Sequence, residues 1–432
     1  MFDHDMQGLL NDINRTVENI TQAVVGDAEN DISHLNNDAE PDASTSDFSE
    51  LLNGINEKVY PNSKYYKLSC LVHLFHLKCL NGWSNKSLSM LLEFLIDLLP
   101  EGNLILKTTH QVKRILRHLG LCYEKIDACP DGCMLFWEEK KKDEVCSFCG
   151  TSRWKVVEET DVEITETKKK ASNILRWSPL KPRLQRLFES SKTADLMKWH
   201  HVDRVIDGKL RHPTDALSWK NFDQKFPDFA SDPRNIRLAL ASDGFNPFKT
   251  MNVAYSIWPV FLVPYNLPPW LVMKQPNFIL SLIIPGPRSP GNKIDVYMQP
   301  LVKELQELWE VGVRTYDAST KQHFQLKAAV LSTISDFLGY GILYGWSTKG
   351  KLACPSCGFD TDSEWLQHGK KWCYMCHRRW LPSDHPWRKD TQSFLGGEES
   401  RDAPVRPSGE EVLRQLVRYD YLKENDGDRW KK

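Results

Sequence analysis

Apolar side chains recur at helical spacing over residues 64–120 and divide this segment into three predicted helices. The breaks fall at Gly82 and at Pro100, because Gly and Pro interrupt helical patterns. Ser84 and Ser87 are both suited to cap the start of the second helix. We therefore expect a small helical bundle over residues 56–122. The positions that share the helical faces are Leu68, Leu71, Val72, Phe75, Cys79 and the apolar residues within 88–99 and 112–119.

The pattern changes after residue 232 to the short apolar runs that are typical of β-strands. The segments Val253–Val263 and Phe278–Ile284 predict two strands, and the apolar stripe over Tyr297–Gly312 predicts a helix. Another apolar segment, His323–Asp336, predicts a further strand. Residues 233–350 are thus expected to form an α/β domain.

Two of the predicted strands end in an aspartate. The apolar run Leu238–Ala241 leads to Asp243, which is followed at once by Gly244, and the later strand ends at Asp336. An Asp in this position often caps the next helix. Carboxylates arriving from separate strands are also what two divalent metal ions require for phosphoryl transfer. The pattern alone leaves both interpretations open.

The cysteines are bunched, and the first group has the spacing of a zinc site. Cys129, Cys133, Cys146 and Cys149 follow the pattern C-x3-C-x12-C-x2-C. Zinc binds four such thiolates at tetrahedral corners, and Gly150 supplies the turn that a CxxC knuckle needs. Four protein ligands leave no open position, so we expect a structural zinc in a ribbon-like module over residues 123–160. A chance grouping of reduced thiols is the alternative.

The second cysteine group offers more ligands than one zinc ion needs. Cys354 and Cys357 form one CxxC pair, and three further candidates, Cys373, Cys376 and His377, follow before His385. Four ligands suffice for zinc, so chemistry alone does not choose among these six. Residues 351–390 are expected to form a second zinc-binding insert.

Charge is distributed unevenly along the 432 residues. Residues 1–50 hold twelve Asp or Glu against the single Arg15, which leaves ten more basic than acidic residues over the rest of the chain. We interpret residues 1–55 as an acidic disordered tail and residues 161–232 as a basic linker with helices. The basic body suits a polyanion such as DNA. Lys113, Arg114 and Arg117 on the third predicted helix agree with a DNA-reading helix-turn-helix, although a plain helical bundle explains them equally well.

The composition also excludes some classes of protein. The longest apolar runs are too short to span a bilayer, so no membrane segment is expected. The first residues are acidic and polar, which is unlike a secretory signal. We expect an intracellular globular protein.

Several longer runs together resemble a known family. They are CPDGC, SDPRNIRLALASDGFNPF, HFQLKAAVLSTISDFLGYG, GWSTKGKLACPSCG and CHRRWLPSDHPWRK. These runs are similar to the transposase of plant CACTA (En/Spm) elements, and the resemblance extends from about residue 60 to near residue 406. It implies a DDE-type DNA transposase with a ribonuclease H-like core, acting on transposon ends in the nucleus as a homo-oligomer on DNA.

The resemblance also assigns roles to residues. It implies that Asp243 and Asp336 are the first two catalytic acids, which hold Mg²⁺ or Mn²⁺. It further implies that Cys354, Cys357, His377 and His385 hold the second zinc, with Cys373 and Cys376 as the rival ligands.

The third acid of the family pattern is not identified in the chain. Glu410 and Glu411, on a short predicted helix within the C-terminal tail of residues 391–432, are candidates. If neither serves, the chain is incomplete as an enzyme, and the alternative is a catalytically inactive DNA-binding protein derived from a transposase.

Overall fold

The computed structural model describes residues 57–118, 123–155, 169–248, 255–394, 397–405 and 408–414. The chain divides into two compact units, Met1–Ser335 and Asp336–Lys432, and each is described by itself below. The expected acidic tail over residues 1–55 lies outside the described residues.

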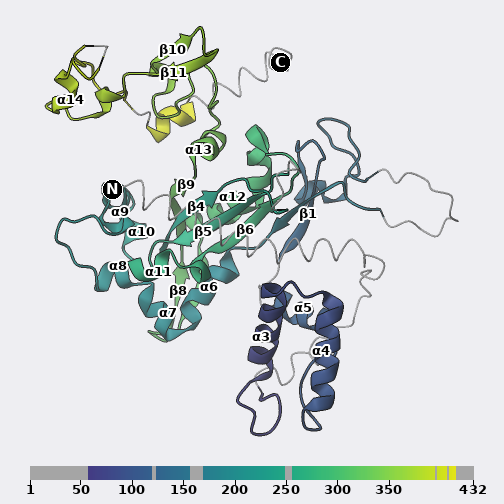
Figure 1. Cartoon of the computed structure of the whole chain (residues 1–432). Coiled ribbons are helices and arrows are strands. Elements are labelled where there is room, and N and C mark those ends of the chain that lie inside the picture. Colours follow the sequence, from purple (N-terminus) through teal and green to yellow (C-terminus); the bar gives the residue numbers. More distant parts are fainter. Residues whose placement is uncertain are drawn as a thin grey trace, which may run out of the picture. The chain divides into compact units, whose positions relative to one another are not determined.

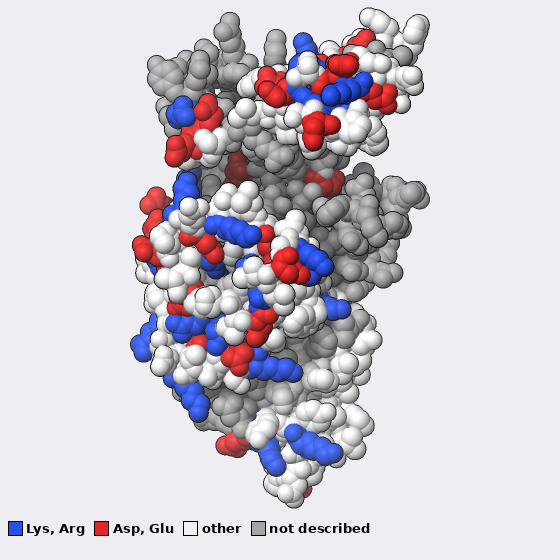
Figure 2. Space-filling view, turned by 90° about the vertical axis from the view of Figure 1, so that its left-hand side faces the viewer, with Lys and Arg blue, Asp and Glu red and all other residues white. Residues whose placement is uncertain are grey.

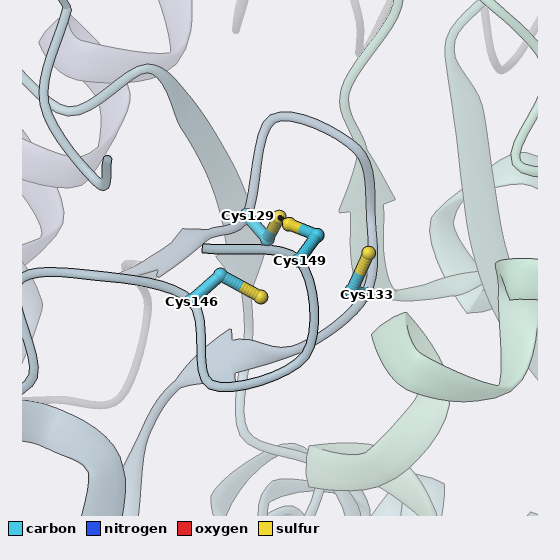
Figure 3. A group of neighbouring side chains, drawn as sticks. All are labelled: Cys129, Cys133, Cys146 and Cys149. Carbon is cyan, nitrogen blue, oxygen red and sulfur yellow. Dashed lines mark hydrogen bonds between the residues drawn. The ribbon is translucent and has the colours of Figure 1, made fainter. Parts of the chain in front are cut away.

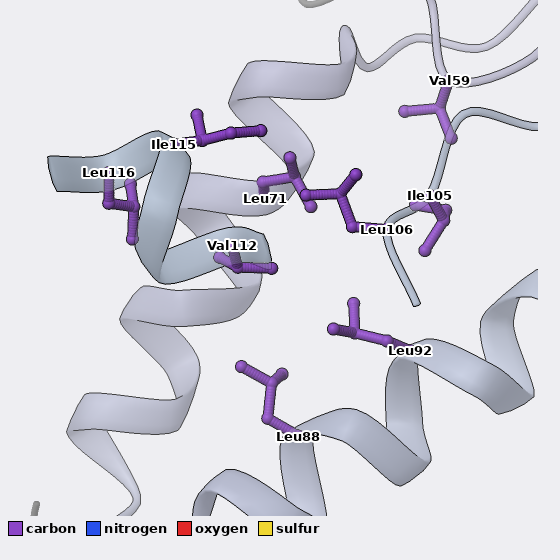
Figure 4. Close-up of a cluster of buried hydrophobic side chains, with 9 residues drawn as sticks. All are labelled: Val59, Leu71, Leu88, Leu92, Ile105, Leu106, Val112, Ile115 and Leu116. Carbon is purple, nitrogen blue, oxygen red and sulfur yellow. The ribbon is translucent and has the colours of Figure 1, made fainter. Parts of the chain in front are cut away.

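Three helices form the first part of unit 1. They are α3 (Lys67–Leu80), α4 (Asn85–Leu98) and α5 (Thr109–His118). Ser84 caps α4 as predicted, because its side chain accepts a hydrogen bond from the Ser87 N–H. Burial of one apolar face of each helix holds the three together. The buried side chains, drawn in Figure 4, are Val59, Leu71, Leu88, Leu92, Ile105, Leu106, Val112, Ile115 and Leu116.

Seven strands of the described residues form one mixed sheet in the order β2-β1-β3-β6-β5-β4-β9. The central strands β4 (Ile236–Ser242), β5 (Trp258–Pro264) and β6 (Ile279–Ile284) pair antiparallel. Every residue of β4 and β5 is buried, which explains why both strands are mostly apolar. Helix α12 (Ile294–Glu310) then crosses the sheet, packing on β3, β6 and β9 (Figure 1).

Strand β9 (Ala328–Ile334) is the edge strand of the sheet and pairs parallel to β4. Their register sets Ala241 opposite Ile334, so the two strands end at the same edge of the sheet. Parallel neighbours need a crossover, and the segment that contains α12 provides it. This arrangement explains how residues far apart in sequence reach one edge.

The single strand predicted over His323–Asp336 is two strands. Strand β8 (Gln322–Leu326) pairs with β7 (Val313–Asp317) in a separate hairpin, whereas β9 pairs with β4. The change of partner occurs at Lys327, whose N–H bonds the Asn235 side chain and whose carbonyl accepts from the Ile236 N–H. The apolar pattern cannot reveal this change of partner, because β8 and β9 both contain buried residues.

Three strands of the sheet come from segments that the pattern did not identify as strands. They are β1 (Glu124–Ala128), β2 (Leu135–Phe136) and β3 (Asn173–Trp177). Strand β3 joins β6, with Trp177 opposite Leu282, and β1 joins β3. The segment that carries the first cysteine group is therefore an extension of the central sheet.

The remaining helices are short. Helix α6 (Lys181–Glu189) is fixed to α12, because the buried Glu304 carboxylate accepts hydrogen bonds from the Leu180 and Lys181 N–H groups at 2.8 and 2.7 Å. A carboxylate is favourable there, since a helix N-terminus carries partial positive charge. The others in unit 1 are α7 (Ser191–Leu196), α8 (Trp199–Val202), α9 (Leu217–Lys225), α10 (Pro227–Ala230) and α11 (Pro269–Val272).

The described residues of unit 2 form small elements. They are α13 (Phe337–Tyr344), the two-stranded sheet of β10 (Ser363–Leu366) and β11 (Lys371–Tyr374), and α14 (Pro386–Lys389). Residues 409–414 are helical as well, which agrees with the short helix expected in the tail.

None of the described helices has the length and apolarity to cross a membrane. On the face shown in Figure 2, Lys and Arg side chains are interspersed with Asp and Glu. The excess of basic residues is thus not gathered into one patch on that face.

One charged side chain is buried in the middle of the core. Arg237 on β4 is 2 % exposed, and it stacks on the rings of Trp219 and Phe229 at 4.6 and 5.1 Å. Its guanidinium bonds the Asp223 carboxylate at 2.5 Å. Burial lowers the pKa of Arg237, and the Asp223 charge opposes that change. The pair ties α9 to the central strand.

We predict that Asp223→Ala lowers the free energy of unfolding by about 2 kcal/mol, because it leaves the buried guanidinium without its carboxylate. Chemical denaturation measures this loss. Asp228→Ala is the matched control, since Asp228 is exposed on the neighbouring helix. Equal stability of the two variants would contradict the assignment.

Candidate functional site

Four cysteine thiols of unit 1 meet at one point (Figure 3). The sulfur atoms of Cys129, Cys133, Cys146 and Cys149 all lie within 4.8 Å of one another, and those of Cys129 and Cys149 are 3.5 Å apart. Sulfur ligands of a tetrahedral zinc lie about 3.8 Å apart, from a Zn–S bond of about 2.3 Å. The arrangement confirms that the first predicted cysteine group can hold a structural zinc ion.

Each half of the cluster is a backbone turn that contains a glycine, although the first hydrogen bond spans three residues and the second spans four. In the first, the Gly132 N–H bonds the Cys129 carbonyl at 2.8 Å, and in the second the Gly150 N–H bonds the Cys146 carbonyl at 2.9 Å. Both glycines have positive φ, 66° and 71°, a conformation that disfavours other residues. Each turn points two sulfurs toward a common centre, which is the geometry of a zinc knuckle.

The thiols differ strongly in their environments. Burial raises the pKa of Cys129 to about 12. Hydrogen bonding with Thr151 lowers the pKa of the exposed Cys149 to about 6. Thiols are deprotonated when they bind metal, so zinc would replace their protons here. The chemistry and the spacing of the donors both suit zinc.

The cluster is anchored to α12. Lys293 donates to the Asp131 carbonyl within the first turn, and the Tyr297 hydroxyl lies against Gly132, 3.1 Å from where a Cβ would stand. Asn173 on β3 also donates to that hydroxyl, at 3.3 Å. These contacts connect the metal-binding turns to the helix that crosses the sheet. The sequence pattern gave no sign of Lys293 or Tyr297, because neither stands near the cysteines in the chain.

Asp243 lies where the pairing of β4 with β5 is interrupted. The strand ends at Ser242, opposite Val260, and the same register resumes in the bridge between Phe245 and Ile257. This register sets Asp243 opposite Pro259, which has no N–H to donate to the ladder. The chain therefore leaves regular strand structure at the aspartate that the sequence singled out.

The Asp243 carboxylate is half-buried and held by its own turn. Its Oδ1 accepts a hydrogen bond from the Gly244 N–H at 2.6 Å. A carboxylate offers about four lone-pair positions, so this bond is compatible with a cation at the same group. Sequence reasoning found Asp243 but missed Pro259 and Trp258, whose effect depends on cross-strand register.

Asp336 begins unit 2 and serves as the N-cap of α13. Its Oδ1 accepts from the Gly339 N–H at 2.5 Å. Asp336 therefore caps a helix, which is one of the two roles that the sequence left open for it. A capping carboxylate can also bind a cation, so this bond does not decide between the two roles.

The second cysteine group resembles the first in only one part. The Gly358 N–H bonds the Cys354 carbonyl at 2.9 Å, and Gly358 has a φ of 56°, so Cys354–Gly358 repeats the turn of Cys146–Gly150. Elsewhere the candidates have other partners, since the His385 Nδ1 accepts from the Trp387 N–H and Cys373 approaches Met375. Within the described ranges, a set of three or more ligands close enough to share an ion is found only at the first group.

Comparison with known proteins supports one class. Residues 207–419 match a family model of transposases. The family is described as transposase family tnp2, and the matched segment contains β4, α12 and β9 of unit 1 together with the second cysteine group. No curated protein matches the chain.

We predict that Cys146→Ser removes about one equivalent of zinc from the purified protein and lowers its melting temperature by at least about 5 °C, because three thiols hold the ion weakly. Metal analysis and thermal unfolding measure the two effects. Chelation of wild-type protein should produce the same destabilisation. Cys70→Ser, which removes a thiol from the helical segment, should leave the zinc content unchanged, and a variant at Cys146 with full zinc content would exclude the site.

Proposed function

We propose that the chain is a DDE-type DNA transposase that cleaves and transfers DNA strands at the ends of a transposable element. The observation that carries this proposal is the match of residues 207–419 to transposase family tnp2. The family also suggests DNA as the partner. The sheet supports the proposal, since an antiparallel set β4-β5-β6 followed by a strand parallel to β4 agrees with a ribonuclease H-like core.

In this proposal Asp243 and Asp336 are metal ligands. Asp243 follows the end of β4, and Asp336 comes two residues after β9, the parallel neighbour of β4. Oxygen ligands of this kind suit Mg²⁺ or Mn²⁺. When bound, such a cation would supply positive charge for the nucleophile and for the leaving oxygen. Each carboxylate would contribute oxygen ligands, Asp243 from the turn after β4 and Asp336 from the start of α13.

The third acid is assigned to Glu410 or Glu411. Glu410 is exposed, whereas Glu411 bonds Arg414 at 3.0 Å. Glu411 could bind a metal ion only after its ion pair with Arg414 is broken, which costs free energy. Glu410 is therefore the more favourable ligand of the two.

The second zinc site is proposed at Cys354, Cys357, His377 and His385. Its support is the turn Cys354–Gly358, which repeats the backbone of the first cluster. Cys373 and Cys376 are the alternative ligands to the two histidines. Together with the first cluster, this assignment gives two zinc ions per chain.

The remaining parts of the proposal follow from the resemblance to plant CACTA (En/Spm) transposases. They are a nuclear location, recognition of transposon ends and assembly of several copies on DNA. Each is a property of the intact protein with its DNA, and each is open to direct measurement.

We predict that Asp243→Asn abolishes Mg²⁺-dependent cleavage of a DNA duplex carrying the element ends, because the substitution removes the charge that holds the metal. DNA binding should persist and should weaken with rising salt, since phosphate contacts dominate it. Cleavage and gel-shift assays on the same preparations measure both.

Asp228→Asn is the control, and it should cleave as the wild type does, because Asp228 is exposed on α10. If wild-type protein binds the duplex but cleaves nothing in Mg²⁺ or Mn²⁺, the chain is a DNA-binding protein without transposase activity. Cleavage by Asp243→Asn at the wild-type rate would exclude the role given to Asp243.

A further inference from the structure

Gly244, which follows Asp243 directly, stands against the indole of Trp258. The register of β4 and β5 sets these two residues opposite each other. A Cβ built on Gly244 would lie 2.6 Å from Trp258 Nε1, 2.7 Å from Trp258 Cε2 and 2.7 Å from the Ser256 hydroxyl. Real Cβ atoms do not approach other atoms so closely, so a side chain at Gly244 requires the indole or the turn to move.

Lack of space, rather than a left-handed backbone conformation, favours a glycine at this position. The φ of Gly244 lies outside the left-handed region, which other residues avoid. Gly369 offers a comparison, because its φ is also ordinary but a Cβ there would meet the Lys371 and Leu366 side chains only at ordinary contact distances of 3.4 to 3.7 Å. Alanine is therefore acceptable at Gly369 and excluded at Gly244 by the ring of Trp258.

The indole itself is held firmly. Trp258 is 5 % exposed, and its Nε1 has no hydrogen-bond partner in the part of the chain that the structure describes. A buried donor without a partner is unfavourable, so packing rather than hydrogen bonding keeps the ring in place. On both sides of this contact the backbone is fixed, by the Phe245–Ile257 bridge and by the pairing of Ser242 with Val260.

The contact acts directly on the carboxylate of Asp243. The Gly244 N–H donates to Asp243 Oδ1 at 2.6 Å, so the orientation of the carboxylate depends on where the Gly244 backbone lies. That backbone rests on the indole.

We propose that Gly244 and Trp258 are positioning residues for Asp243: the indole supports the glycine backbone, whose N–H fixes the carboxylate for a divalent cation. This inference rests on the proposed function of Asp243 as a metal ligand. It adds two residues that touch neither metal nor DNA.

The test measures Mn²⁺ binding to the zinc-loaded full chain by calorimetry, together with thermal unfolding. Gly244→Ala should weaken Mn²⁺ binding at least tenfold. In the background Ser256→Ala/Trp258→Val, which removes the atoms that the Cβ would meet, the same substitution should change the affinity less than threefold. Gly369→Ala is the matched control and should bind Mn²⁺ as the wild type does.

Asp243→Asn separates the two hypotheses. If it abolishes Mn²⁺ binding while Gly244→Ala leaves the affinity within twofold of wild type, the positioning role is wrong and the metal site stands. If Asp243→Asn leaves Mn²⁺ binding unchanged, the proposed function of Asp243 is what fails. An equal loss from Gly244→Ala in both backgrounds would also overturn the inference, because the space beside Trp258 would then be irrelevant.

A further variant, Trp258→Phe, tests the positioning role even if Gly244→Ala does not fold. Trp258→Phe keeps an aromatic ring and removes the unpartnered donor, which offsets part of the packing that the smaller ring loses, so the protein should still fold. Its Mn²⁺ affinity should fall at least threefold, because a smaller ring supports the Gly244 backbone less closely. Unchanged affinity in this variant would contradict the role of Trp258.

Discussion

The parallel pairing of β4 with β9 is the constraint on which the architecture of unit 1 depends. Strand β4 is buried along its whole length and has β5 on one side and β9 on the other. Such a strand satisfies its backbone groups only if both neighbours are present. Bringing β9 beside β4 requires the crossover that contains α12 and the hairpin β7–β8. It also places β9 in contact with α9. The edge of the sheet where Asp243 lies is a product of this pairing.

The cysteine cluster extends the same sheet by different means. Strand β1 leads directly into Cys129, and β2 begins two residues after Cys133. These strands are short and carry few apolar residues, so burial alone gives them little stability. Metal coordination can replace a hydrophobic core in so small a segment. The contacts of Lys293 and Tyr297 then join this segment to the helix that spans the sheet.

The sequence revealed those features that depend on local pattern or on ligand chemistry. Strand β6, helix α12, the cap at Ser84 and the four cysteines were all predicted close to where the structure has them. Strand β3 was missed because its residues are half polar, and its partner β6 lies about a hundred residues further along the chain. The roles of Pro259 and Trp258 were missed because only the register sets them opposite Asp243 and Gly244. The local apolar pattern contains no information about which residues of β4 and β5 lie opposite each other.

The boundary between the two units has a consequence for biosynthesis. The last strand of the seven-stranded sheet ends at Ile334, and the second unit begins at Asp336. Domains generally fold as units while the ribosome is still extending the chain, N-terminal regions first. Every strand of the sheet has therefore been made before the first residue of the second unit emerges, and the sheet can close without waiting for it.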